Sequence, residues 1–458
     1  MSEFDDTMEL PASVRLSGCD YFLLASENGG ARQSRAVSNV CRIVIKLGAR
    51  LDAEVLRRAL TASPLLRWLG RIRYVPRFPM RMPLWTASCA AGGCVVEEHD
   101  SPIPQESDTC TCDWANMISE LRFDSAPGFV FHLFQHANDK TTLLMAWHHV
   151  LMDAHGAESF LGLVGGSGDQ PIPLRQLIFL HAQEENDSWF QEIVRLPERL
   201  RICRKSARYV ARMTKSPLVR LLEGDSVEQK PSVHFHELSF DPGQTERIEA
   251  KSRSMNASFC DSLLYLAAAM RAVRAVVKQR GILDGEESYV VPMPIDMRRR
   301  GARGPVVSNH LSFFFFRANP GDMDDLKDLV RLLAGQMKDQ IRDEMPQAFS
   351  VMMDQFRRVP LPIYSKLLRG PTKGEIASFF FSYTGGISKD LGRFLGLPVE
   401  DIVHIPPLSC PPGLTIAFFR NDNRLRFAVS WAEGCLKEEE VALLERSICH
   451  DFSESHEQ

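Results

Sequence analysis

The sequence predicts a mixed α/β chain folded into two lobes, and three observations carry this prediction. The chain has 458 residues, too many for one core at about 150 residues per domain. It contains 44% hydrophobic and 24% charged residues, so it can build large cores without metal or disulfide staples. Each half mixes strand patterns with helical patterns. We therefore expect lobes at residues 1–230 and 231–458, divided near the polar segment "DSVEQKPS".

The first half begins with a β-branched strand at residues 43–45, and Asp52 is placed to cap the helix that follows. Four apolar residues at helical spacing indicate this helix: Val55, Leu56, Ala59 and Leu60. Alternating apolar residues from Phe129 and an apolar run at 143–147 flank the turn "ANDK" and predict a hairpin. A further helix is expected over about 156–163.

The second half opens with a predicted strand at 233–240 and continues with a long helix over 256–281. Ser258 and Asp261 resemble a capping box at its start, and Gly281 is a natural stop. Strands at 288–298 and 308–319 flank an arginine-rich loop. Near the end, "LTIAFFRNDNRLRFAVSW" predicts a hairpin that turns at three residues, Asn421, Asp422 and Asn423.

Composition excludes several classes of protein. The net charge of −4 argues against a nucleic-acid partner, whose phosphates call for a basic surface. The eleven cysteines are scattered and odd in number, which favours reduced thiols in the cytoplasm, and Cys110 and Cys112 lack the spacing of a zinc knuckle. The N-terminal segment has no apolar core of a signal peptide. The apolar segment 259–277 carries three charged residues and is too interrupted for a membrane span.

The stretch "MAWHHVLMDAHGAESF" holds the main candidate for chemistry. Histidine is the usual general base near neutral pH. Neighbouring residues on a strand point to opposite sides, so only one of His148 and His149 can face a given cavity. Asp153 is placed to cap the next helix, to form an ion pair or to orient a histidine, and Gly156 permits close helix packing.

Other interpretations of this stretch stay open or are disfavoured. A metal pair would need a third ligand, with His155 as the nearest candidate, but the zinc motif of two helical histidines with a glutamate between them is absent from the sequence. We therefore expect no metal ligands. A structural role, with both histidines buried and hydrogen-bonded, is the alternative to catalysis. The sequence contains no G-x-S-x-G, no Walker loop and no G-x-G-x-x-G element after a strand.

The residues "HHVLMD" resemble the HHxxxD signature of the chloramphenicol acetyltransferase-like superfamily. This superfamily includes nonribosomal peptide condensation domains, wax ester synthase/diacylglycerol acyltransferases and alcohol acyltransferases. The segments "LDAEVLRRALTASPLLRWL", "VPMPIDMR", "SNHLSFFFF", "FFFSYTGGI" and "PPGLTIAFF" follow in the order that such proteins show. The resemblance implies two chloramphenicol acetyltransferase-like lobes with a substrate tunnel between them. Ala154 departs from the pattern, since many relatives have glycine there.

The resemblance also implies roles for single residues. His149 matches the catalytic base, and His148 matches its structural neighbour. Asp153 would form an ion pair with Arg298 that ties the lobes together. In "SNHL", Ser308 replaces the glycine of a common Gly-Asn pair. The resemblance places three candidates near substrate or oxyanion: Ser382, Thr384 and Asn309.

The implied reaction is acyl transfer from a coenzyme A or carrier-protein thioester to a hydroxyl or amine acceptor, without a tightly bound cofactor. A free-standing amide-forming condensation enzyme is one alternative. A non-catalytic scaffold that binds a carrier protein or acyl ligand is another. Arg299, Arg300 and Arg303 are candidates for contact with coenzyme A phosphates.

A second basic region has two interpretations. It is either a solvated helical face or a surface for an acidic carrier protein or for anionic lipids, which would place the protein peripherally on the inner membrane surface. Its basic residues are Arg195, Arg199, Arg201, Arg204, Lys205, Arg208, Arg212, Lys215 and Arg220.

Overall fold

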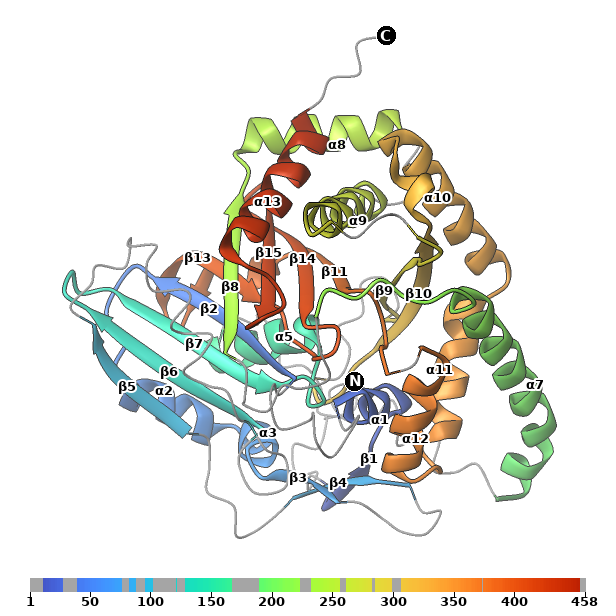
Figure 1. The fold of residues 1–458 in the computed structure, drawn as a ribbon. Helices are drawn as coiled ribbons and strands as arrows, with labels where there is room; N and C mark the ends of the chain where they lie inside the picture. The colour runs from blue at the N-terminus through green and yellow to red at the C-terminus, as the bar shows by residue number, and fades with distance from the viewer. Residues whose placement is uncertain are drawn as a thin grey trace.

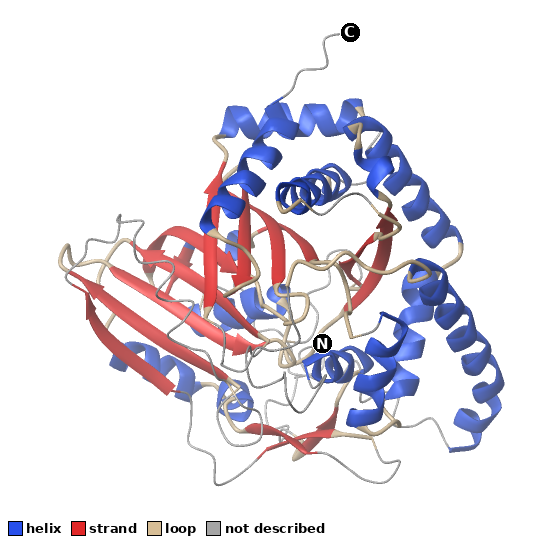
Figure 2. Cartoon of the chain, in the orientation of Figure 1, coloured by secondary structure: helices blue, strands red, loops and turns tan. Residues whose placement is uncertain are grey.

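The computed structural model describes residues 11–27, 39–75, 82–87, 95–101, 121, 128–166, 189–222, 232–255, 261–281, 285–298, 306–372 and 374–453. Within these residues the chain forms two main sheets, each flanked by helices (Figures 1 and 2). The mixed α/β class is as predicted.

The larger sheet has six strands in the order β12-β13-β2-β7-β6-β5. Its strands are β2 (Val40–Leu47), β5 (Val95–Ser101), β6 (Phe129–His136), β7 (Thr141–His148), β12 (Arg393–Phe394) and β13 (Leu397–Ile405). One face of the sheet shares a core with helices α2 (Ala53–Ala62), α3 (Pro64–Leu69) and α5 (Ala154–Gly165). β5 and β6 pair in parallel, and the other neighbours pair antiparallel.

The second half of the chain completes this first sheet. β12 and β13 follow η5 (Lys389–Gly392), and β13 pairs with β2 from Val399–Leu47 to Ile405–Arg42. The second predicted segment therefore contributes to the first, because strands from 231–458 lie in the sheet built mainly by 1–230. The predicted boundary near 230 stays a prediction.

The smaller sheet has the order β11-β14-β15-β8. Its strands are β8 (Val233–Ser239), β11 (Phe380–Gly386), β14 (Leu414–Asn421) and β15 (Arg424–Ala432). Helices α8 (Pro242–Ser254), α9 (Ser262–Gln279), α10 (Leu326–Arg342) and α13 (Glu438–Ser453) surround it and the ribbon of β9 (Tyr289–Asp296) and β10 (Leu311–Ala318) (Figure 1). Fourteen of the eighteen residues of α9 are buried, so this helix is the centre of the second core.

A third apolar cluster joins the two sheets. It combines Val44 and Val130 of the six-stranded sheet with Phe235, Phe419 and Ala428 of the four-stranded sheet. The remaining described elements lie outside the two main sheets. They are β1 (Ser13–Arg15), β3 (Ile72–Val75), β4 (Leu84–Ala87), α1 (Gly18–Glu27), α7 (Trp189–Met213), η3 (Pro320–Met323), α11 (Met345–Phe356), α12 (Leu361–Arg369) and η4 (Gly370–Thr372). β1, β4 and β3 form a small antiparallel sheet.

Most predicted elements are present. The hairpins of β6 with β7 and of β14 with β15 are confirmed. Asp422 and Asn423 both adopt positive φ, at 47° and 61°, as a two-residue hairpin turn requires. Asp52 caps α2 by accepting from the backbone N–H of Glu54. Gly281 follows α9 at φ 73°, the left-handed conformation that ends a helix.

Two boundary predictions are wrong. α9 as described begins at Ser262 with Asp261 as its N-cap, so Asp261 is not in the third helical position of a capping box; Ser258 lies outside the described residues. α5 begins two residues early, at Ala154, because Asp153 caps it. In the part of the chain that the structure describes, helices long and apolar enough to cross a membrane are absent.

Candidate functional site

The two histidines follow one another at the end of β7, and their side chains diverge. His148 is buried, and its Nε2 lies 2.9 Å from Oε2 of Glu27 on α1. Its Nδ1 accepts a hydrogen bond from the backbone N–H of Val150, so the proton is on Nε2 and points at Glu27. Although burial raises the pKa of Glu27, His148 holds it below its ordinary value. His148 therefore contacts α1 and is not among the residues that line the cavity beside His149.

His149 faces a cavity instead. Its backbone N–H donates to the carbonyl of Asn39 at 2.8 Å, and its carbonyl accepts from Nδ2 of Asn309 at 3.0 Å. Its Nδ1 is buried and makes no hydrogen bond with any group in the described part of the chain, which leaves Nε2 as the nitrogen available to a ligand. Burial lowers the pKa of His149, while its own carbonyl and Asp153 act in the opposite direction. The imidazole is thus neutral, and able to accept a proton, at neutral pH.

Asp153 is a junction between the two halves of the chain. Arg298 donates from both terminal nitrogens to its carboxylate, at 2.8 and 3.0 Å. The same carboxylate accepts from the backbone N–H groups of Gly156 and His310. Burial raises the pKa of Asp153, but Arg298, together with the backbone N–H groups of Gly156 and His310, lowers it below its ordinary value. The structure thus brings together Asp153 and Arg298, which the sequence places 145 residues apart.

Gly156 allows the helix to start against this junction. A Cβ at Gly156 would lie 2.9 Å from Cβ of Met152 and 3.3 Å from Oδ1 of Asp153. Larger residues would therefore push α5 away from the carboxylate that caps it.

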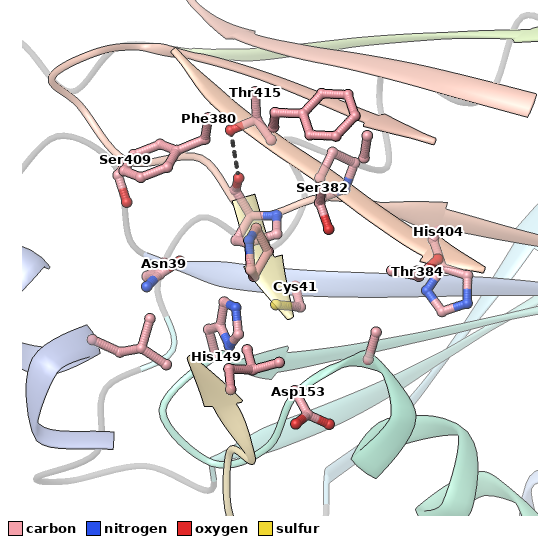
Figure 3. Close-up of a pocket in the computed structure, with 18 of the residues that line it drawn as sticks. Asn39, Cys41, His149, Asp153, Phe380, Ser382, Thr384, His404, Ser409 and Thr415 are labelled. Atoms are coloured by element: carbon pink, nitrogen blue, oxygen red, sulfur yellow. Dashed lines mark hydrogen bonds between the residues drawn. The ribbon is translucent and has the colours of Figure 1, made fainter. Parts of the chain in front are cut away.

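The cavity, of about 200 Å³, lies between the two sheets and the β9–β10 ribbon. Figure 3 shows His149 and Asp153 on one side of it and Ser382 and Thr384, from β11, on the other. Most of the wall is apolar and includes Phe22, Trp147, Leu311, Phe313, Phe380 and Phe419. An apolar cavity with a few polar groups is the usual form of a small-molecule site. Ser382 and Thr384 are thus in the same cavity as His149.

Asn309 lies elsewhere, and its candidacy as an oxyanion donor is corrected. It is buried and does not line the cavity. Its side-chain amide donates to Oδ1 of Asp20 at 2.9 Å and to the carbonyls of His149 and Val150 at 3.0 and 3.1 Å. These bonds occupy its N–H groups, so Asn309 fixes the backbone at His149 instead of donating to a substrate.

The hydrogen bonds of Asn309 can be tested by substitution. Asn309→Ala removes the only described side-chain amide that bridges Asp20 to the carbonyls of His149 and Val150. Leaving buried groups without a hydrogen bond costs about 1–3 kcal/mol each, so we expect a lower free energy of unfolding, measured by urea denaturation. Ser382→Ala, on the cavity wall, is the matched control and should leave that free energy within about 0.5 kcal/mol of wild type. Unchanged stability in Asn309→Ala would contradict the bridging role.

A second polar cluster in the cavity wall escaped sequence analysis. His155 and His404 both line the cavity. The buried carboxylate of Glu158 lies 3.2 Å from Nε2 of His404 and 3.9 Å from Nδ1 of His155, and it accepts from the backbone N–H of Ser388 at 3.2 Å. His155 and Glu158 are three residues apart on one helix face, and this spacing could have been recognised from the sequence. No sequence pattern indicates that His404, on β13, joins them.

The pKa shifts in this cluster predict a stability window. Although burial acts to raise it, the two histidines lower the pKa of Glu158 to about 2, from 4.5, so its stabilisation is present above pH 4.5 and is lost as the pH falls towards 2. The carboxylate raises the pKa of His155 above 6.5, so that stabilisation is complete below pH 6.5 and is lost as the pH rises through the raised pKa.

Glu158→Gln should therefore destabilise the protein most between about pH 4.5 and 6.5, by a few kcal/mol. Differential scanning calorimetry at about pH 3, 5.5 and 8.5 measures the difference in Tm from wild type. The matched control is Glu445→Gln, which removes a carboxylate that contacts an exposed histidine, His236. A Tm difference that is constant across the three pH values would refute the coupling.

Several residues that the sequence analysis considered lie outside the described residues. They are Arg299, Arg300, Arg303, Cys110 and Cys112. Six cysteines fall within described parts of the chain and all are free thiols: Cys19, Cys41, Cys203, Cys410, Cys435 and Cys449. His155 does not join His148 and His149 in a metal site, because His148 points to Glu27 and His155 to Glu158.

Comparison with solved structures identifies the class of fold. The chain has the chloramphenicol acetyltransferase-like fold shared by condensation domains and acetyltransferases, so the resemblance suggested by "HHVLMD" is confirmed at the level of the fold. No protein-family model matches the chain, and no curated protein matches its sequence.

Three particular structures illustrate the likeness. Trichothecene 15-O-acetyltransferase from Fusarium sporotrichioides has a TM-score of 0.67 at 15% identity, over 98% of this chain and 97% of its own. The first condensation domain of the CDA synthetase has a TM-score of 0.66 at 14% identity, over 96% of each chain. The epimerization domain from the third module of tyrocidine synthetase B has a TM-score of 0.60 at 14% identity, over 98% of each chain.

Proposed function

We propose that this protein is an acyltransferase that moves an acyl group from a thioester to a hydroxyl or amine acceptor. The observation that carries the proposal is the position of His149. This neutral imidazole has its Nδ1 buried in the wall and lies in an apolar cavity between the two sheets. The fold alone does not select a reaction, because the similar structures include an acetyltransferase, a condensation domain and an epimerization domain.

The chemistry needs only groups that line this cavity. Nε2 of His149 takes the proton of the acceptor as the acceptor oxygen or nitrogen bonds to the thioester carbonyl carbon. The carbonyl oxygen gains the negative charge, and the hydroxyls of Ser382 and Thr384 are candidates to donate hydrogen bonds to it. The intermediate collapses when the carbon–sulfur bond breaks, and the imidazolium returns its proton to the departing thiolate. The acyl group never bonds to the protein.

The apolar wall supports an apolar acyl group or acceptor. Phe22, Phe313, Phe380 and Phe419 surround the space beside His149. Removing water from this space strengthens the interaction of the imidazole with the reacting groups. Holding both substrates in one cavity also converts a bimolecular step into a unimolecular one, which is worth several kcal/mol of the barrier.

The proposal is tested with purified protein and a panel of acyl thioesters and acceptors. The donors are acyl-coenzyme A and acyl-carrier protein, and the acceptors are matched alcohols and primary amines of equal chain length. Thiol release and product mass are followed. Product formation with one donor type alone identifies the donor. Product formation with the alcohols indicates ester formation, and product formation with the amines indicates amide formation. Failure with both donor types would favour the non-catalytic scaffold.

The basic residues of α7 extend the proposal to the donor. Arg204 and Arg208 are exposed on this helix, whereas Arg201 is paired with Glu198. We propose that this face attracts an acidic carrier protein, since opposite charges steer association. Carrier-protein turnover should then fall with added salt more steeply than coenzyme A turnover. Sedimentation with anionic liposomes at low and high salt tests the competing proposal of a lipid surface.

A further inference from the structure

Three side chains with metal-binding groups converge outside the cavity, at the edge of the six-stranded sheet. Glu97 and His99 are two residues apart on β5, so they share one face of the strand. The strand register places Glu97 directly opposite His132 on β6. None of the three lines the cavity with His149. β5 is the last strand of the sheet (Figure 1).

The ligand atoms lie at distances suited to one ion. Nε2 of His99 is 2.9 Å from Nδ1 of His132, and Oε2 of Glu97 is 3.3 Å from that same Nδ1. The carboxylate oxygen lies 4.0 Å from Nε2 of His99. His132 is buried, while the side chains of His99 and Glu97 are 28% and 51% exposed. One fixed ligand and two adjustable ones thus meet at a position that solvent can reach.

The surroundings of the fixed ligand also suit a cation. A metal ion binds the neutral form of histidine. The two facing imidazole nitrogens can share only one proton between them. The neighbouring carboxylate adds negative charge that an ion would neutralise.

We propose that Glu97, His99 and His132 bind a divalent transition-metal ion, with zinc as the best fit. Two imidazole nitrogens and one carboxylate oxygen suit zinc, whereas magnesium and calcium prefer oxygen ligands alone. Zinc–nitrogen bonds of about 2.0–2.1 Å place two tetrahedral ligands about 3.3 Å apart. The two nitrogens now lie 2.9 Å apart, so a small outward shift of the exposed His99 suffices. Three protein ligands leave a fourth position open.

The positions of the three ligands also determine how tightly the site binds zinc and how binding affects the stability of the folded chain. Nε2 of His132 has no hydrogen-bond partner among the described residues, whereas metal-binding histidines usually donate from their second nitrogen to a supporting acceptor. Binding is therefore weaker than at a four-ligand structural zinc site. Because the ligands lie on both β5 and β6, the ion would join the edge strand to its neighbour and stabilise the folded chain.

The experiment is isothermal titration calorimetry with zinc chloride on the full-length protein after treatment with a chelator. We expect one zinc ion per chain and a raised Tm in its presence, with no such response to magnesium. His132→Ala and His99→Ala should each weaken zinc binding by at least about 100-fold. The matched control is His236→Ala, which removes an exposed histidine of another histidine–carboxylate pair, on β8, and should leave zinc binding unchanged.

Absence of zinc binding by the wild type, or equal binding by His99→Ala and wild type, would overturn the proposal. His99 is partly exposed, so its alanine variant decides the question even where His132→Ala fails to fold. The absorption spectrum of bound cobalt in the wild type provides an independent measure of the coordination. These measurements do not involve turnover, so their outcome is independent of the proposed acyl transfer.

Discussion

Replacing His149 by alanine is expected to lower kcat for acyl transfer by about 10²- to 10⁴-fold, which is the usual contribution of a general base. The folded structure should persist. The imidazole lines the cavity, and its Nδ1 holds no other described group in place. Steady-state kinetics with the donor and acceptor found in the panel, together with the Tm, measure both effects.

The pH profile provides a second measure of the same role. Burial lowers the pKa of His149 below 6.5, so in wild type the acid limb of kcat/KM should fall below about pH 6.5. His149→Ala should lose this limb. His236→Ala, on the exposed side of β8, is the control and should retain full activity. Near-normal turnover by a folded His149→Ala protein would remove His149 from the mechanism.

Replacing Arg298 by alanine is expected to lower the free energy of unfolding by about 3–5 kcal/mol, the usual cost of breaking a buried ion pair. The side chains of Arg298 and Asp153 are only 5% and 4% exposed. Without Arg298, the partners left to the carboxylate of Asp153 among the described residues are the backbone N–H groups of Gly156 and His310. Urea denaturation at neutral pH measures the loss.

Two further measurements separate this pair from general damage. Arg298 lowers the pKa of Asp153 below 3.8, so the stabilisation is present above pH 3.8 and is lost as the pH falls through the lowered value. The stability difference between wild type and Arg298→Ala should shrink accordingly in acid. Asp296→Asn removes only a partly exposed partner of Arg298 and should cost less than about 1 kcal/mol. Equal losses in both variants would contradict the buried pair.

Local sequence patterns predicted much of the fold because their causes are local. The hairpin of β14 and β15 follows from apolar alternation around two residues that tolerate positive φ, Asp422 and Asn423. The opposite directions of His148 and His149 follow from the period of a strand. The start of α5 was predicted two residues too late, because Asp153 caps the helix directly while it also pairs with Arg298 far along the chain.

Contacts between distant segments left no local signal. β13 inserts beside β2 in the first sheet, yet its sequence does not specify its partner. Asn309 reaches Asp20 across 289 residues, and this contact converts a predicted oxyanion donor into a support for the backbone at His149. His404 joins Glu158 in the same way, from a strand that carries no motif.

The sequence by itself determined the mixed α/β class, the strand-to-helix turn that carries the two histidines and the resemblance to one superfamily. These depend on periodicity and spacing over a few residues, which the backbone geometry enforces directly. Only the tertiary structure decided which polar groups share the cavity with His149, which ones support it from behind, and that Glu97, His99 and His132 converge at the sheet edge. Those outcomes depend on packing between elements tens to hundreds of residues apart, where burial and register select the partners and residue identity alone does not.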